Sequence, residues 1–134
     1  MIERYFHEKE GYNPFLIEDN WQVAQLNYLP KHGLDDIDDV EVHVQTDEVF
    51  VLTKGTGVLI AADLTGDEIV FECVNMQQGV TNNIPAVVWH NIAMDKEASM
   101  IIVEKANTHL NDCKHQLLDE KTAQRLYAEI AKLL

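Results

Sequence analysis

The sequence predicts an all-β fold, a sandwich or barrel of short antiparallel strands with one α-helix at the C-terminus. Short β-rich runs recur through the middle of the chain, and turn residues separate them roughly every eight to twelve positions. The end of the chain instead places apolar side chains at helical spacing. With 134 residues and a hydrophobic fraction of 46%, residues 1–134 have the size of one domain and can form a core without disulfide bonds.

The expected strands are placed by their apolar and β-branched residues. They cover residues 21–28, 48–54, 56–62, 69–76, 87–94 and 98–105. Gly55 and Gly57 separate the second strand from the third and favour a tight turn, so we expect these two strands to form a hairpin. Residues 1–20 mix aromatic and charged side chains. They are predicted to be an irregular N-terminal arm that caps the barrel or reaches a partner subunit.

Residues 119–134 are predicted to form the C-terminal helix. Asp119 is the expected N-cap, and the apolar residues that follow it at helical spacing are Ala123, Leu126, Tyr127, Ile130, Leu133 and Leu134. A free helix of this length is marginally stable, so its apolar face must be covered. The same stripe would serve on the outside of the barrel or against a second subunit, and the sequence leaves both open.

The charge of the chain excludes some classes of partner. Asp and Glu number 23 against 10 Lys and Arg, which gives a formal net charge of −13 and argues against nucleic acid and anionic membranes. No segment approaches the roughly 20 apolar residues of a membrane helix, and no signal peptide is visible, so we expect a cytoplasmic protein. The acidic run from Asp35 to Glu41 is interpreted as a solvated loop, with a cation-attracting mouth of the barrel as the alternative.

The polar stretch around His43 is the strongest functional signal. Glu41 and His43 are two residues apart on an expected strand and share a face, and the corner that follows allows Glu48 to face them from the next strand. His90 lies on a later strand, where Asn91 should point the other way. A polar cluster among apolar residues must be paired, hydrated or metal-bound, because uncompensated burial is costly.

These residues resemble the two sequence motifs of the cupin family. The first motif is His-x-His followed by Glu and Gly, and the second runs from Gly through Pro to His. The positions that match at the family spacing are His43, Glu48 and Gly55 in the first motif and Gly79, Pro85 and His90 in the second. The sequence departs from the motifs at four positions: Asp35 stands where the family has the opening glycine, Glu41 where it has its first histidine, Val87 where it has an inner glycine, and Met94 where it has the closing asparagine. The resemblance implies a cupin-like antiparallel β-barrel (jelly roll) with an interior metal site, and a homodimer.

The residue chemistry of this set suits a divalent first-row metal such as Fe, Mn, Ni or Zn, with His43, Glu48 and His90 as ligands. Glu41 is a candidate fourth ligand in place of the imidazole, or it orients His43 or a bound water. Both histidines must be neutral to bind a metal, so the affinity should fall below about pH 6.5. The alternative is a metal-free polar pocket in which these groups only hydrogen-bond with one another.

The predicted function is that of a small cupin that binds a divalent metal and acts on a small polar metabolite, a sugar or an organic acid. The reaction type stays open, because a fold does not decide it. A non-catalytic ligand-binding or sensor barrel without metal is one alternative, and the loss of the first motif histidine favours it. A scaffold whose helix and arm only make contacts is the other. Several polar residues are expected to have no role in the site: His32 in a loop, Glu104 and Asn107 at the surface, and Cys73 and Cys113, which follow no metal-binding spacing.

Overall fold

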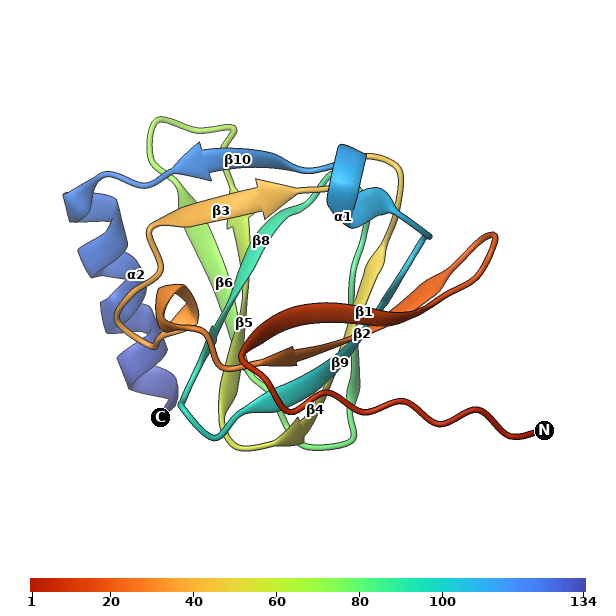
Figure 1. Cartoon of the computed structure of the whole chain (residues 1–134). Helices are drawn as coiled ribbons and strands as arrows, with labels where there is room; N and C mark the ends of the chain where they lie inside the picture. Colours follow the sequence, from red (N-terminus) through yellow and green to blue (C-terminus); the bar gives the residue numbers. More distant parts are fainter.

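The computed structural model describes residues 1–134 and shows two antiparallel sheets that face each other as a barrel, with a helix on one side (Figure 1). The first sheet has the order β1-β2-β9-β4-β7, and the second has the order β10-β3-β8-β5-β6. The strands are β1 (Gly11–Ile17), β2 (Gln22–Asn27), β3 (Asp39–Val42), β4 (Glu48–Lys54), β5 (Gly57–Asp63), β6 (Val70–Asn75), β7 (Thr81–Ile84), β8 (Trp89–Met94), β9 (Ser99–Glu104) and β10 (Lys114–Leu117). The helical segments are η1 (Pro30–His32), α1 (Thr108–Asn111) and α2 (Glu120–Leu133). None of these helices has the length and apolar character needed to cross a bilayer. The predicted all-β barrel with a C-terminal helix is confirmed.

The interior of the barrel is apolar at one end and polar at the other. Side chains two apart on a strand share a face, and three central strands each carry one polar residue in their inward-facing series. These series are Glu48, Phe50 and Leu52 on β4, Met100, Ile102 and Glu104 on β9, and His90, Ile92 and Met94 on β8. The register pairs Glu48 with Glu104. The three polar side chains therefore gather at the same end of the barrel, above a packed apolar core.

Helix α2 covers the outer face of the second sheet (Figure 1). The Asp119 side chain accepts a hydrogen bond of 2.8 Å from the Thr122 N–H, as an N-cap does. Leu126 and Ile130 are buried against Ile60 and other residues that point outward from the sheet. The apolar stripe of the helix is thus used on the outside of the barrel, which decides between the two placements that the sequence left open.

The prediction of an irregular arm over residues 1–20 is wrong for its second half. Residues 1–10 have no regular structure, but Gly11–Ile17 form β1, the edge strand of the first sheet. The strand contains Pro14, and its register with β2 shifts between Pro14 and Leu16. Proline is tolerated at a sheet edge and at a bulge, because no ladder hydrogen bond is lost there.

The predicted hairpin between residues 48–54 and 56–62 is also wrong. β4 pairs with β7 and β9, whereas β5 pairs with β6 and β8 in the other sheet. Gly55 has a φ of +73°, and a Cβ atom there would lie 2.6 Å from the Cα of Ala98. Gly55 therefore lies where the chain crosses from one sheet to the other and passes close to the backbone of Ala98. It is not part of a hairpin turn.

Candidate metal centre

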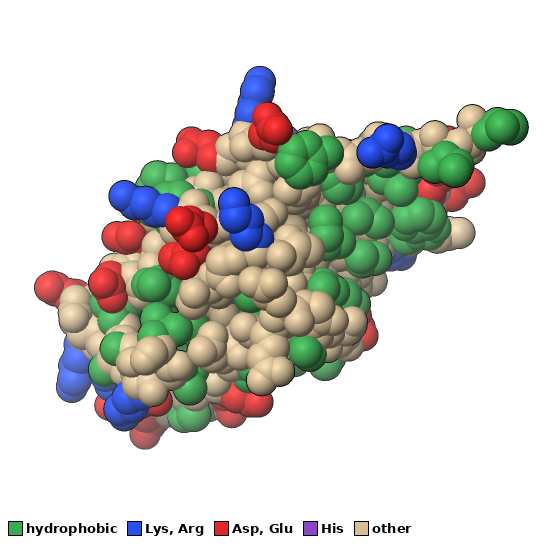
Figure 2. All heavy atoms as spheres, turned by 90° about the horizontal axis from the view of Figure 1, so that it is seen from below, with side chains coloured by type: hydrophobic (Ala, Val, Ile, Leu, Met, Phe, Trp, Pro, Cys, Tyr) green, Lys and Arg blue, Asp and Glu red, His purple; other side chains and the backbone are tan.

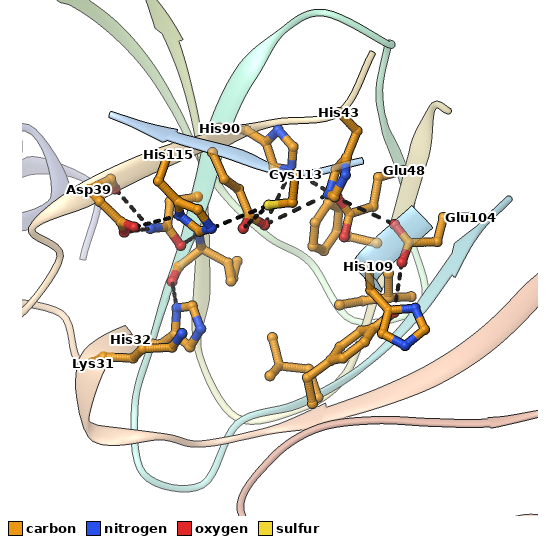
Figure 3. A pocket seen from close by; sticks show the side chains of 17 residues that line it. Lys31, His32, Asp39, His43, Glu48, His90, Glu104, His109, Cys113 and His115 are labelled. Atoms are coloured by element: carbon orange, nitrogen blue, oxygen red, sulfur yellow. Dashed lines mark hydrogen bonds and ion pairs between the residues drawn. The ribbon is translucent and has the colours of Figure 1, made fainter. Parts of the chain in front are cut away.

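Three side chains converge at the polar end of the barrel (Figure 3). The Nε2 atom of His90 lies 2.8 Å from Oε2 of Glu48, and the Nε2 atom of His43 lies 3.2 Å from the same oxygen. All three residues are buried. Glu41 is half-buried, and its Oε1 atom lies 4.0 Å from His43 Nε2 and 3.8 Å from His90 Nε2. The structure thus brings all four predicted site residues together, with their ligand atoms within 4.8 Å of one another.

Backbone carbonyls fix the orientation of both imidazole rings. Nδ1 of His90 lies 2.9 Å from the carbonyl oxygen of Val88, and Nδ1 of His43 faces the carbonyl oxygen of Asp112. A carbonyl only accepts hydrogen bonds, so each Nδ1 carries the proton and donates it. In a neutral ring the Nε2 atom is then a bare acceptor that points at the carboxylate. Metal-binding histidines are oriented in this way.

This arrangement brings together three groups that each offer a lone pair. Two Nε2 atoms and the Glu48 carboxylate repel one another unless a proton or a cation lies between them. A divalent ion of the first transition row would satisfy all three, because imidazole nitrogen and carboxylate oxygen are both among its usual ligands. The donor set therefore fits the metal that the sequence predicts.

Protons compensate the same groups where no cation is bound. Burial acts to lower the pKa of His43, but the hydrogen bond and the charge of Glu48 outweigh it and raise this pKa to about 9. The pKa of His90 is raised against burial for the same reason. Burial acts to raise the pKa of Glu48, but the hydrogen bonds of the two histidines lower it to about 2. A metal must therefore displace protons that are held more tightly than on a free imidazole.

Glu104 belongs to the site, and the prediction that it lies at the surface is wrong. Its side chain is buried, and Oε1 accepts hydrogen bonds from the Tyr12 hydroxyl at 2.7 Å and from Gln22 Nε2 at 3.0 Å. Oε2 is buried without a hydrogen-bond partner and lies 3.9 Å from Nε2 of His43. Burial and the charge of Glu48 raise the pKa of Glu104. The sequence did contain a signal for the position of Glu104. Met100 and Ile102 point inward, and the alternation of side chains along β9 directs Glu104 to the same face.

The polar end opens into a cavity of about 290 Å³. His32 also lines this cavity, but its ring bonds to the carbonyl of Ile92 at 3.1 Å, and it is not one of the four clustered residues. Asn91 is likewise outside the cluster and donates to the Asp39 carbonyl at 2.8 Å and to Asp39 Oδ1 at 3.0 Å. Neither residue is therefore a candidate ligand, as the sequence predicts.

The structure is similar to solved structures of cupins. A cupin-2 domain protein from Shewanella frigidimarina aligns with a TM-score of 0.51 and 22% identity, over 75% of this chain and 84% of its own. Pac13 from Streptomyces, a nucleoside dehydratase whose structure was solved with uridine, aligns with a TM-score of 0.57 and 12% identity, over 87% and 93%. A protein from Bacillus halodurans aligns with a TM-score of 0.56 and 15% identity, over 88% and 84%. No protein-family model and no curated sequence matches the chain. At these identities the comparisons establish the fold alone, and they confirm the cupin-like barrel that the sequence predicts.

Proposed function

We propose that this chain is a metal-dependent enzyme that binds a divalent cation through His43, Glu48 and His90 and acts on a small polar metabolite. One observation carries the proposal: both Nε2 atoms point at one carboxylate oxygen, and both Nδ1 atoms are held by backbone carbonyls. Glu41 is the fourth ligand, since one of its oxygens faces both histidines. The bound metal would act as a Lewis acid on an oxygen of the substrate.

The lining of the cavity favours an uncharged substrate. Glu41, Glu48 and Glu104 all line it, while Lys31 is its one lysine or arginine. A divalent ion would neutralise only part of this negative charge, so an organic acid would meet repulsion that a sugar would not. The volume of about 290 Å³ lies near the lower end of ligand sites. Of the two predicted substrate classes, we therefore propose the sugar.

Glu104 is the proposed general acid or base. Tyr12 and Gln22 hold one of its carboxyl oxygens, which leaves Oε2 directed toward His43 without a partner. A carboxyl group beside a bound substrate can remove or deliver a proton. This arrangement suits an isomerase or a lyase. Glu104→Gln is expected to abolish turnover while the protein keeps its full metal content.

Metal analysis of protein purified without chelators tests the proposal. We expect bound divalent metal in the wild type, one equivalent less in His90→Ala, and no change in His32→Ala. The His32 variant is the matched control, because His32 lines the same cavity outside the cluster. Equal metal content in the wild type and the His90 variant would refute the proposed site.

A metal-free ligand-binding barrel is the second candidate, and a specific contact favours it. Glu48 already forms close ion pairs with both histidines when these are protonated, so the pocket can persist without metal. In that case the purified protein would contain no metal at this site. A sugar would still raise the melting temperature, by an amount set by its concentration relative to its Kd.

The homodimer stays a prediction, and the N-terminal region supports it. The exposed apolar side chains of this region are Met1, Ile2, Tyr5, Phe6, Ile17 and Trp21. Figure 2 shows hydrophobic side chains gathered on the side of the molecule from which the arm projects. Contiguous exposed apolar surface of this kind marks interaction sites. Sedimentation velocity of the full chain and of a Phe6→Ser variant would test whether this surface joins two subunits.

A further inference from the structure

Strands β3 and β10 are the last two strands at one edge of the second sheet, at the mouth of the cavity. Their antiparallel register places His115 opposite Glu41. His115 lies on β10 and Cys113 immediately precedes that strand, while Glu41 lies on β3 and His43 immediately follows it. The pairing of the two strands thus brings four potential ligands to the cavity. All four of these residues line it.

Three of these side chains form a second cluster beside the first. Sγ of Cys113 lies 3.3 Å from Oε2 of Glu41 and 3.3 Å from Nε2 of His115. The ligand atoms of the three residues lie within 4.8 Å of one another. Glu41 belongs to both clusters, with Oε1 toward His43 and His90 and Oε2 toward Cys113. Figure 3 shows Cys113 and His115 beside the histidines of the inner site.

His115 is oriented as the two inner histidines are. Its Nδ1 atom lies 2.8 Å from Oδ2 of Asp39, while the other carboxylate oxygen of Asp39 accepts a hydrogen bond from Asn91. A carboxylate that accepts from Nδ1 fixes the tautomer and leaves Nε2 free to bind a metal. In that tautomer Nε2 needs a proton or a cation opposite it. The single S–H proton of Cys113 can serve either this nitrogen or Glu41, and not both.

We propose that Cys113, His115 and Oε2 of Glu41 form a second metal site, for a zinc-like cation, at the mouth of the barrel. Thiolate, imidazole and carboxylate are the usual ligands of zinc, and three protein ligands leave a fourth position open to water or substrate. A hard ion such as magnesium or manganese is disfavoured by the thiolate. This site goes beyond the proposed function and does not require the inner site to hold a metal.

The shared carboxylate gives a chemical reason for Glu41. In His43 and His90 the Nδ1 atom donates to a backbone carbonyl, and only Nε2 is free to bind a metal. A histidine at position 41 that was oriented in the same way would offer one nitrogen. A carboxylate has two oxygens, and those of Glu41 face different clusters. Glu41 can therefore bridge two cations. Replacement of the motif histidine by glutamate adds a site rather than removing a ligand.

Cobalt titration of the reduced full-length protein tests the second site. A thiolate bound to Co²⁺ gives a charge-transfer absorption in the near ultraviolet, and nitrogen and oxygen ligands do not. We expect the wild type to bind two equivalents of Co²⁺ and to show this absorption. Cys113→Ser should lose the absorption and one equivalent, whereas the matched control Cys73→Ser should keep both. Circular dichroism spectra of each variant check that it is folded.

Two further variants separate the second site from the inner one. Glu41→His should keep the inner equivalent and weaken the outer site at least tenfold, and Asp39→Asn should weaken the outer site by roughly 10–100-fold. His90→Ala should lose one equivalent and keep the thiolate absorption. If the inner site is wrong, His90→Ala changes nothing while the absorption persists. If wild-type protein shows no thiolate absorption, or Cys113→Ser retains it, the second site is refuted.

Discussion

The pH dependence of metal binding at the inner site tests the geometry of the cluster directly. The sequence alone places the loss of affinity below about pH 6.5, the pKa of an ordinary histidine. In the structure Glu48 opposes the effect of burial and raises the pKa of His43 to about 9. Since a proton competes with the metal for Nε2, affinity should keep rising with pH well above 6.5. The expected window lies between about pH 6.5 and 9.

The size of the effect follows from the displaced proton. The pKa of His43 lies about two units above pH 7. Each unit corresponds to about 1.36 kcal/mol in the free energy of deprotonation. Removal of this proton thus costs roughly 3 kcal/mol at pH 7, so metal affinity at pH 7 should be on the order of 100-fold weaker than for the fully deprotonated site well above pH 9. The pKa of His90 is also raised. Affinity should therefore increase at least about tenfold between pH 7 and pH 8.

Manganese is the suitable probe, because the thiolate of the outer site disfavours it. Free Mn²⁺ can be counted by electron paramagnetic resonance during titrations at pH 6, 7 and 8. His115→Ala should leave the profile unchanged. Glu48→Gln should weaken binding and move the rise to lower pH, because the group that raises the histidine pKa is gone. An affinity that is constant between pH 7 and pH 8 would contradict the proposed contact between Glu48 and His43.

Three stability predictions follow from the packing and the backbone. Val87 is exposed and has a φ of 64°, so Val87→Gly should raise the free energy of unfolding by roughly 0.5–1 kcal/mol, whereas Val80→Gly, at another exposed valine, should lower it. Gly55→Ala should destabilise by more than about 2 kcal/mol, and by more than Gly79→Ala, since both have positive φ but only Gly55 has backbone within 3 Å of the added Cβ. Leu126→Ala, which removes a fully buried side chain from the inner face of α2, should cost about 2–5 kcal/mol in urea unfolding without changing metal content. The strain argument for Val87 is wrong if Val87→Gly is less stable than the wild type. The packing arguments are wrong if Gly55→Ala and Gly79→Ala have equal effects, or if Leu126→Ala leaves stability unchanged.

Local pattern was enough to predict most of the fold, and pairing between strands was not. The strands and the helix were visible because their apolar residues recur with periods of two and about 3.6. The partner of a strand depends on its register and on the whole sheet, so Gly55 looked like a hairpin turn although it lies in a crossing between sheets. β1 was missed because it pairs with β2 alone at the sheet edge and is interrupted by a bulge near Pro14.

The residues of the candidate site that match the motif spacing could be predicted from the sequence. His43, Glu48 and His90 match the cupin motifs, and the structure brings them together. Glu104 was missed although its place two residues after Ile102 on β9 indicates an inward side chain. Cys113 could not be placed from spacing alone, because it approaches Glu41 only through the pairing of β10 with β3. Tertiary register, rather than residue type, therefore decides which polar groups reach the site.

Two of the departures from the cupin motifs, Val87 and Glu41, have different physical consequences. Val87 keeps the left-handed conformation expected for the glycine it replaces, and its N–H donates to the carbonyl of His43 at 2.7 Å. This substitution costs backbone strain but leaves the loop in contact with the residue that bears a site imidazole. Glu41 keeps its side chain directed at the cluster and replaces one nitrogen donor with two oxygens. The first departure therefore affects the stability of the barrel, whereas the second is the one on which both proposed metal sites depend.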